Sequence, residues 1–291
     1  MSSLKQQQHS FIQTIRDNAM QTPLISILIP LFNAEKFIEE TLLSVLNQSY
    51  RNIEVIITDD RSTDASVSKV LRFTDHRVRL SINEENLGPE KNWNQALAKA
   101  TGKYIKLVCC DDLMEKDCLM KQVAIMENSL YSDVGLVSCS RFVINSQGRR
   151  ILQRSFGKLR GRYNGKKIIR RIIQSGNNPI GEPAAGLFRL DIIKKAGCYR
   201  AIAPYVIDLD FWIRLLAKTD IYIIDEPLCS FRISQTSWSA RLNFKQLNDY
   251  LKLIQITAEE NEDILTPMDM VSGQVQCVIK TLLRILIFRL L

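Results

Sequence analysis

The sequence lacks the features that mark disulfide-rich, zinc-binding and nucleic-acid-binding proteins. Its 291 residues include seven cysteines, an odd number with no C-x-x-C pair, and only two histidines. A disulfide framework uses an even set of cysteines, and a structural zinc site uses closely spaced Cys and His ligands. We therefore expect free, buried thiols in a reducing compartment. No nucleic-acid-binding motif is visible and the basic residues do not alternate with stacking aromatics, so we expect no nucleic acid partner.

Leader, membrane-spanning and glycine-rich phosphate-binding segments are also missing. The N-terminus has no basic region followed by an apolar core, and no run of about 18 apolar residues exists to span a bilayer. Neither a G-x-G-x-x-G nor a G-x-x-x-x-G-K motif occurs, so a dinucleotide or P-loop site would lack its phosphate cradle. We expect a protein of the cytoplasmic side, with an ordinary soluble composition of 46% hydrophobic and 24% charged residues.

Two adjacent carboxylates, Asp111 and Asp112, follow a short apolar run. Residues 104–110 are apolar apart from Lys106 and too few for a helix, which predicts a buried strand. Ligands of open α/β sheets lie at the carboxyl ends of the strands. Paired carboxylates without a basic neighbour usually need a cation, most often Mg²⁺ or Mn²⁺. The alternative is that one of them caps a helix that starts near Glu115.

Strand-like and helix-like stretches alternate along the first half of the chain. The apolar residues 24–29 predict a strand that Pro30 ends, and residues 53–58 predict a second strand that ends in Asp59 and Asp60. Amphipathic helical patterns follow each strand. This alternation favours an α/β fold with a Rossmann-like, mainly parallel sheet flanked by helices.

The second half of the chain has a less regular pattern. Residues 149–171 contain ten Lys or Arg and no acid, which predicts either a solvated face or a surface that attracts phosphates, polyanions or acidic lipid. Residues 176–188 are rich in Gly, Pro and Asn and predict a long loop, a feature that is usually functional. Residues 221–224 predict a short strand, and residues 228–238 predict a polar, aromatic loop.

Several stretches taken together resemble the inverting family 2 glycosyltransferases, which have a GT-A fold. The first strand, loop and helix of that family resemble ISILIPLFNAEKFIEETLLSVLNQSY in this chain. Its second strand and the following loop resemble IEVIITDDRSTDAS. The passage that leads to its D-x-D motif resembles NLGPEKNWNQALAKATGKYIKLVCCDD. The acceptor loop of the family resembles GEPAAGLFR, its E-D helix resembles IDLDFWIRL, and its final motif resembles PLCSFRISQTSWS. The resemblance implies transfer of a sugar from a UDP- or dTDP-linked donor to a hydroxyl of a glycan or lipid-linked acceptor, in bacterial cell-surface polysaccharide or lipopolysaccharide synthesis.

The resemblance also implies which residues bind the donor. Asp60 would accept a hydrogen bond from the base, Asp111 would reach the ribose or the cation, and Asp112 would ligate a Mn²⁺ or Mg²⁺ ion on the diphosphate. The nucleotide would be bordered by Pro30, Phe32 and Asn33. Asp60 could instead cap a turn.

The predicted catalytic base is Asp208. By resemblance it takes the acceptor proton while the hydroxyl attacks the anomeric carbon opposite the leaving diphosphate, which inverts that carbon. Asp208 could instead cap its own helix, and Asp210 would then be the competing base. Trp212, on the apolar side of the same helix, is expected in the core. The residues predicted to contact the acceptor or the diphosphate are Glu182, Asp210, Arg232 and Trp238.

Three positions depart from the family pattern. Cys109 stands in place of the first Asp of D-x-D, Ile207 in place of a Glu before the base, and Ser234 in place of the His of the final motif. These changes leave open a catalytically silent homologue that binds a nucleotide-sugar, although the four carboxylates of the predicted site are all retained. A nucleotidyltransferase would need a Gly-rich, basic N-terminal loop, which PLFNAEKF is not.

The C-terminal segment is apolar but carries cations. Residues 275–291 contain Lys280, Arg284 and Arg289 and no acid. The segment is too short and too charged to span a bilayer, so we expect a basic amphipathic helix that lies on an anionic membrane, or that docks on the catalytic domain or on a second copy of the chain. The predicted division of the chain is a polar tail at 1–22, a GT-A domain at 23–239 and a helical extension at 240–291.

Overall fold

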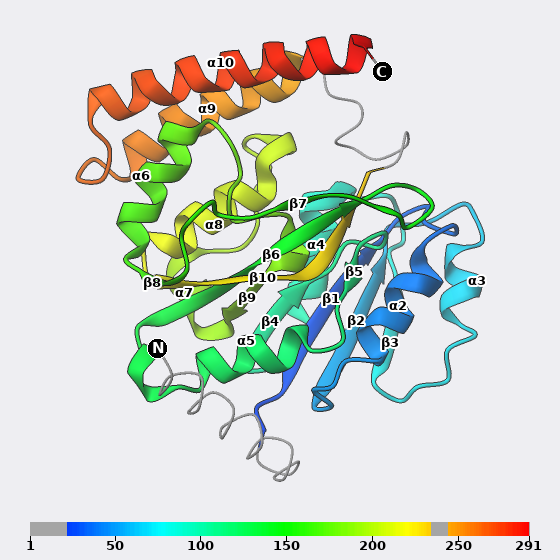
Figure 1. Ribbon diagram of the computed structural model, residues 1–291. Helices are drawn as coiled ribbons and strands as arrows, with labels where there is room; N and C mark the ends of the chain where they lie inside the picture. Colours follow the sequence, from blue (N-terminus) through cyan, green and yellow to red (C-terminus); the bar gives the residue numbers. More distant parts are fainter. Residues whose placement is uncertain (1–21, 234–243, 291) are drawn as a thin grey trace.

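The structure, a computed structural model, describes residues 22–233 and 244–290 and consists of one large sheet covered by helices on both faces (Figure 1). Within these residues the sheet has ten strands in the order β3-β2-β1-β4-β9-β6-β10-β5, with β7 beside β6 and β8 beside β10. The strands are β1 (Ile25–Leu31), β2 (Ile53–Asp59), β3 (Val78–Ile82), β4 (Tyr104–Leu107), β5 (Leu113–Met114), β6 (Val134–Ile144), β7 (Arg150–Arg154), β8 (Gly161–Tyr163), β9 (Gly186–Arg189) and β10 (Asp220–Arg232).

The helices cover the two faces of this sheet and extend beyond it. The α-helices are α2 (Ile38–Leu46), α3 (Ser66–Val70), α4 (Gly88–Ala98), α5 (Cys118–Met126), α6 (Gly165–Ser175), α7 (Leu190–Ala196), α8 (Ile207–Leu216), α9 (Phe244–Glu260) and α10 (Pro267–Leu290). Short 3-10 helices are η1 (Ser129–Tyr131), η2 (Pro183–Ala185) and η3 (Pro204–Val206). The predicted α/β, Rossmann-like fold with a C-terminal helical extension is confirmed. No helix within the described residues is long and apolar enough to cross a bilayer.

Strand β1 lies in the middle of the parallel part of the sheet. It pairs in parallel with β2 and β4, and alternate side chains enter different cores: Ile27 packs on the α2 and α5 side, whereas Leu28 packs on the α4 and α8 side. The strand continues through Pro30 to Leu31, so the prediction that Pro30 ends it is wrong. The Leu28 carbonyl already accepts the last hydrogen bond from the β4 side, from Val108. The nitrogen of Pro30 points to that same side two residues later. No strand within the described residues pairs with β1 there, so the N–H that proline lacks is not needed for a hydrogen bond.

Strand β10 is longer than the sequence predicts. The apolar residues 221–224 form only its first part, and the strand runs in parallel beside β6 to Arg232. Register shifts on both sides of Pro227 absorb this proline as a bulge. The prediction of a loop from residue 228 is therefore wrong for residues 228–232, because pairing with β6, which is distant in sequence, overrides their polar character.

Helices α9 and α10 share a core with helices that cover the sheet. Tyr250 and Ile254 of α9 and Cys277 of α10 belong to the same buried cluster as α6 and α8. The basic run at residues 149–171 forms β7, β8 and the first part of α6: β7 is exposed along its whole length, and α6 buries Ile168 and Ile172 while its cations point outward. The cations of this run are therefore exposed, as both interpretations require, and attraction of anions stays a prediction.

Candidate functional site

The loops after β1 and β2 meet at the carboxyl edge of the sheet. Asn33 adopts a positive φ of 47°, its backbone N–H donates to Ser62 Oγ at 2.9 Å, and its side-chain oxygen accepts from the Thr63 N–H at 2.8 Å. Phe32 beside it is 48% exposed. Pro30 is buried inside β1, which leaves its side chain little surface for a ligand. Phe32 and Asn33 are thus placed at the edge where the sequence predicts the nucleotide.

Asp60 holds the start of α4. Its carboxylate is buried and accepts hydrogen bonds from the backbone N–H groups of Leu87 at 2.8 Å and Gly88 at 2.9 Å, and from the Asn83 side chain at 2.9 Å. Gly88, with a φ of 77°, is the first residue of α4. The alternative that Asp60 caps a turn is therefore realised in the structure. Its contact with a base stays a prediction.

Asp112 has a buried carboxylate oxygen without a partner. Its Oδ1 accepts the Arg232 backbone N–H at 3.1 Å, whereas no described residue donates to its Oδ2. Burial, and then repulsion by Asp111, raise the pKa of Asp112 well above the usual range of an Asp. Helix α5 begins only at Cys118, so neither carboxylate of the pair caps it as the alternative required.

This arrangement fits a divalent cation. A cation would satisfy the free oxygen of Asp112 and remove its repulsion with Asp111, and carboxylate oxygens are ligands that Mg²⁺ and Mn²⁺ prefer. Burial raises the pKa of the Cys109 thiol well above its usual value, so this residue stays neutral and does not replace the missing carboxylate. No group of three or more His, Cys, Asp or Glu that could hold a metal occurs among the described residues. The ligand itself would have to complete the coordination.

Arg232 joins three segments around this pair. Its guanidinium is buried, donates to the Asp111 carbonyl at 2.9 Å and to the Glu40 carboxylate at 2.6 Å, and lies over the Phe37 ring at 4.6 Å. It also donates to the Asn145 carbonyl at 3.2 Å. The predicted contact between Arg232 and a diphosphate is therefore not supported, because protein groups occupy this side chain. The sequence offered no signal for its partner Glu40, which lies in an ordinary helix.

Asp208 lies in the first turn of α8 and is partly buried. Burial, followed by repulsion from Glu182, raises the pKa of Asp208 from 3.8 to about 7. Its carboxylate accepts the Asn178 side-chain N–H at 3.0 Å and the Leu209 N–H at 2.8 Å. The residue before α8 is Val206, so the alternative that Asp208 caps this helix is wrong. A partly exposed carboxylate with a pKa near neutrality is suited to accept a proton.

A hydrogen-bonded loop supports Asp208 from one side. Asn178 is itself held by the Gly181 N–H, which donates to its side-chain oxygen at 3.0 Å. Arg141 fastens the loop by donating to the Asn178 carbonyl at 3.2 Å and to Glu182 at 2.5 Å. A side chain at Gly181, which has a φ of 105°, would meet Arg141 at about 2.9 Å. Sequence reasoning missed Asn178 and Arg141, although the Gly- and Asn-rich composition of the loop was a signal.

Glu182 links the two carboxylate sites. Its charge raises the pKa of Asp112 as well as that of Asp208, so the predicted metal ligand and the predicted base lie in one electrostatic environment. The ion pair with Arg141 holds Glu182 in place, and Arg154 of β7 lies 3.7 Å from its second oxygen. Glu182 is thus near the site but already paired.

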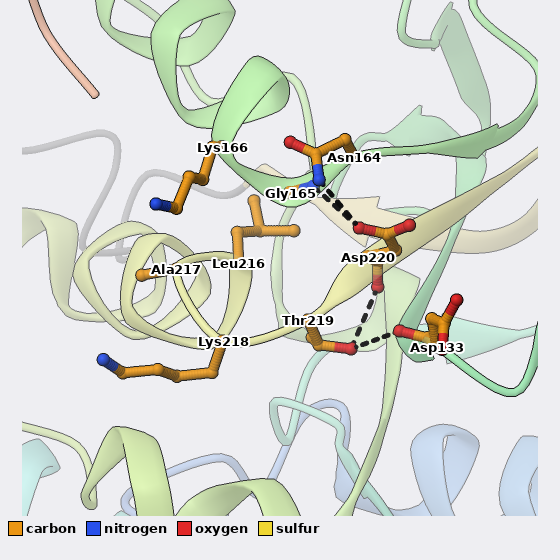
Figure 2. Close-up of a pocket in the computed structure, with 9 residues that line it drawn as sticks. All are labelled: Asp133, Asn164, Gly165, Lys166, Leu216, Ala217, Lys218, Thr219 and Asp220. Atoms are coloured by element: carbon orange, nitrogen blue, oxygen red, sulfur yellow. Dashed lines mark hydrogen bonds between the residues drawn. The ribbon is translucent and has the colours of Figure 1, made fainter. Parts of the chain in front are cut away.

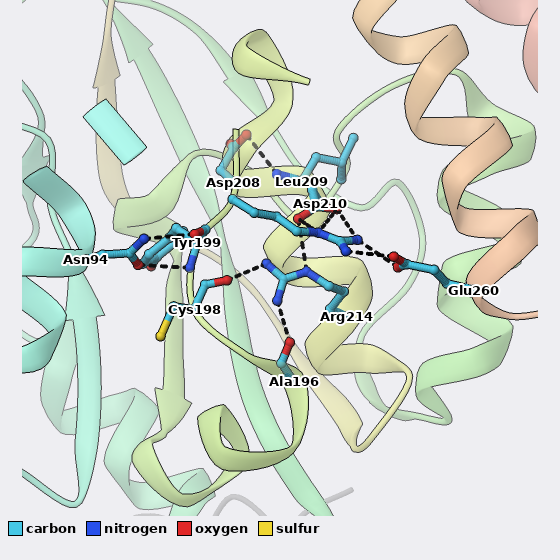
Figure 3. A network of polar contacts seen from close by, with 10 residues as sticks. Asn94, Ala196, Cys198, Tyr199, Asp208, Leu209, Asp210, Arg214 and Glu260 are labelled. Carbon is cyan, nitrogen blue, oxygen red and sulfur yellow. Dashed lines mark hydrogen bonds and ion pairs between the residues drawn. The ribbon is translucent and has the colours of Figure 1, made fainter. Parts of the chain in front are cut away.

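Asp210 is a structural residue, which corrects its assignment as a competing base or acceptor contact. It is 2% exposed and forms ion pairs with Arg200 at 2.9 Å and Arg214 at 3.0 Å, a network that Figure 3 shows beside Asp208. Arg200 also pairs with Glu260 of α9 at 2.6 Å. Two cations therefore occupy the Asp210 carboxylate.

Trp212 is fully buried and its indole N–H donates to the Gly181 carbonyl at 3.2 Å, as expected for a core residue. Trp238 and Ser234 lie outside the described residues.

A separate pocket of about 330 Å³ lies at the opposite edge of the sheet, where β10 begins. Figure 2 shows Asp220 in this pocket accepting hydrogen bonds from Asn164 and Gly165. None of the predicted site residues lines it.

Comparisons with known proteins show which family and fold this chain is similar to. The model of "Glycosyl transferase family 2" matches residues 26–197. The chain is 29% identical over 233 residues to WfgD of Escherichia coli, a UDP-Glc:alpha-D-GlcNAc-diphosphoundecaprenol beta-1,3-glucosyltransferase, and the match covers 78% of this chain and 84% of that protein.

Two solved structures share the fold. S. aureus TarS in complex with UDP-GlcNAc aligns with a TM-score of 0.69 at 20% identity, over 87% of this chain and 71% of that one. The mannosyltransferase PcManGT of Pyrobaculum calidifontis, in complex with GDP-Man and Mn²⁺, aligns with a TM-score of 0.62 at 17% identity, over 94% and 79%. These likenesses confirm the predicted GT-A fold. Because the family model covers more than half of the chain, this protein belongs to glycosyl transferase family 2.

Proposed function

We propose that the protein is an inverting glycosyltransferase that moves a sugar from a UDP- or dTDP-linked donor to a hydroxyl of a glycan or lipid-linked acceptor in cell-surface polysaccharide synthesis. The observation that carries this proposal is the pairing of a partly exposed Asp208, with a pKa of about 7, and a buried Asp112 with a free oxygen, both influenced by Glu182. One carboxylate can take a proton while the other can hold a cation.

Asp208 acts on the acceptor. Its carboxylate accepts the proton of the acceptor hydroxyl as the oxygen forms a bond to the anomeric carbon, and the bond from that carbon to the diphosphate oxygen breaks on the opposite face. One displacement inverts the anomeric carbon. Asn178 keeps the Asp208 carboxylate oriented through the 3.0 Å hydrogen bond, and Arg141 keeps Asn178 in place.

The donor lies across the carboxyl edge of the sheet. Phe32, Asn33 and Asp60 border the nucleotide, and Asp111 and Asp112 would hold a Mn²⁺ or Mg²⁺ ion. When bound, the ion neutralises the charge that develops on the leaving diphosphate. PcManGT, of the same fold, was solved with Mn²⁺, and WfgD acts on a lipid-linked acceptor, which supports both parts of the proposal.

Binding of the donor can be tested with a thermal-shift panel of UDP, dTDP, GDP and ADP, each with and without Mn²⁺. We expect UDP or dTDP to raise the melting temperature most, and only in the presence of the metal, because a ligand stabilises the state that binds it. Equal shifts with and without Mn²⁺ would show that the cation assignment is wrong.

A measurement of turnover distinguishes an active glycosyltransferase from a homologue that only binds the nucleotide-sugar. Release of UDP from UDP-sugars is measured with a lipid extract as acceptor, for the wild type, for Asp208→Asn and for Asp191→Asn, a control that removes an exposed carboxylate of α7. We expect the first variant to bind UDP normally and release almost none, and the control to behave like the wild type. If Asp208→Asn keeps full turnover, the base lies elsewhere. Binding without turnover in the wild type would favour the silent homologue.

A further inference from the structure

Helix α10 turns a broad apolar surface toward solvent. The outward face consists of Met268, Val271, Val275, Val278, Ile279 and Leu282, whose exposed fractions range from 39% for Val278 to 76% for Met268. The other exposed positions between 267 and 283, which are Pro267, Gln274 and Leu283, carry no charge either. A continuous apolar surface of this kind on a soluble protein usually marks an interaction site.

The opposite side of α10 is fastened to the catalytic domain, so the helix cannot rotate to bury this face. A side chain at Gly273 would meet the Ile173 carbonyl at about 2.6 Å, which shows how closely α10 approaches α6. Lys280 donates to the Ser175 carbonyl at 2.5 Å, and Asp269 accepts from Gln174 at 2.5 Å. The sequence predicts docking and membrane contact as alternatives, whereas in the described part of the chain one side of the helix docks and the residues of the other side are exposed.

The composition of the outward face argues against a coiled coil with a second copy. Positions 268, 271, 275, 278 and 282 follow the three-four spacing of a coiled-coil seam, but the flanking positions Ser272, Gln274, Ile279 and Thr281 carry no charge. Two-stranded coils in water are bordered by charged residues that select the partner. Ile279 and Leu283 also widen the apolar surface beyond a narrow seam.

Exposed lysines and exposed acids are separated along α9. Helices α9 and α10 lie side by side and are joined by a short connection at 261–266, so the start of α9 is next to the C-terminal half of α10 (Figure 1). Lys245 lies at the start of α9 and Lys252 at its middle, and both are exposed, whereas the exposed acids Glu259, Glu260, Glu262 and Asp263 lie at the other end. An apolar face on α10, together with exposed lysines on the neighbouring α9, complements an anionic lipid surface.

We propose that the outward face of α10 docks the protein on an anionic bilayer, with Lys245 and Lys252 facing the lipid headgroups. The apolar side chains enter the interface without spanning it, in agreement with the absence of a spanning helix among the described residues. This docking does not depend on the identity of the donor or acceptor.

Flotation with vesicles tests the proposal. The full chain is mixed with neutral phosphatidylcholine vesicles or with vesicles that also contain phosphatidylglycerol, at low and high salt. Variants are Val275→Glu/Val278→Glu on the outward face, and the control Leu43→Glu/Leu71→Glu, which places two charges at exposed leucines, one in α2 and one directly after α3. We expect the wild type and control to float with anionic vesicles, and the outward-face variant to bind roughly tenfold less. A third variant, Lys245→Glu/Lys252→Glu, should lose binding to anionic vesicles at low salt.

Melting temperature and UDP binding show whether each variant is folded, and light scattering reports the oligomeric state. The proposal is overturned if the wild type stays in the soluble fraction with anionic vesicles at low salt, or if a folded Val275→Glu/Val278→Glu variant floats as well as the wild type. It is also overturned if the wild type is a dimer that this variant dissociates while neither protein floats, since the outward face would then be an interface between copies.

Discussion

Replacing Asp208 with Asn should change how the stability of the protein depends on pH. In the folded protein, burial and the charge of Glu182 raise the pKa of Asp208 from 3.8 to about 7. In the unfolded chain the carboxyl regains its ordinary pKa. Between these two values the folded state binds a proton that the unfolded state has lost, so the contribution of Asp208 to the free energy of unfolding is complete at low pH and disappears as the pH rises through about 7.

The size of the effect follows from the pKa difference. About two pH units separate pH 5 from the folded pKa, and each unit is worth about 1.4 kcal/mol, so this group should cost the wild type roughly 3 kcal/mol of stability between pH 5 and pH 8. The amide of the Asp208→Asn variant does not titrate. Asp111 and Asp112 titrate in both proteins, so their contributions cancel when the two are compared.

Urea unfolding of both proteins at several pH values measures this difference. The free energy of unfolding of Asp208→Asn, relative to the wild type, should increase by roughly 2 to 3 kcal/mol between pH 5 and pH 8. Asp191→Asn removes an exposed carboxylate and serves as the control, for which we expect little change. A relative stability of Asp208→Asn that is the same at every pH would refute the raised pKa and, with it, the main argument for Asp208 as the base.

Three further predictions follow from the contacts around the site. Asp112→Asn should abolish the strengthening of UDP binding by Mn²⁺, because the amide removes the charge that holds the ion. Calorimetry measures this metal dependence, and the same dependence as in the wild type would contradict the role of Asp112. Tyr250→Phe should lower turnover but leave UDP affinity unchanged, because the Tyr250 hydroxyl donates to the Asn177 carbonyl at 2.8 Å, next to the residue that holds Asp208; a parallel loss of UDP affinity would speak against this coupling. Gly273→Ala should destabilise the protein by about 1 to 3 kcal/mol in urea unfolding, because the added methyl group meets the Ile173 carbonyl, whereas Val271→Ala on the outward face should cost less than about 0.5 kcal/mol. Equal effects of these two substitutions would show that α10 is not packed as described.

Much of the parallel sheet was predictable because its signals are local. The apolar runs at β1, β2 and β4 are buried on both faces and each is followed by polar residues, so sequence alone located the edge of the sheet where Asp60, Asp111 and Asp112 lie. The errors arose where pairing between distant residues decided the outcome. β10 extends through Pro227 because β6 offers a partner along its length, and no pattern within residues 225–232 indicates this.

The roles of charged side chains were harder to predict, because a sequence shows which groups can ionise but not which of them meet. Asp208 and Asp210 are two residues apart in the same helix and have similar chemistry. Only the tertiary structure places Arg200 and Arg214 on Asp210 and leaves Asp208 beside Asn178 and Glu182.

The sequence by itself determined the α/β class and the family resemblance and supplied the candidate carboxylates, since these depend on residue types and spacing along the chain. The tertiary structure alone decided that Arg232 is a structural residue, that Asp112 keeps a free oxygen and that α10 packs the side with Cys277 on the core while its other apolar face is exposed. Each of these outcomes depends on how segments far apart in the chain approach one another, which sets burial and therefore the energy of every buried charge.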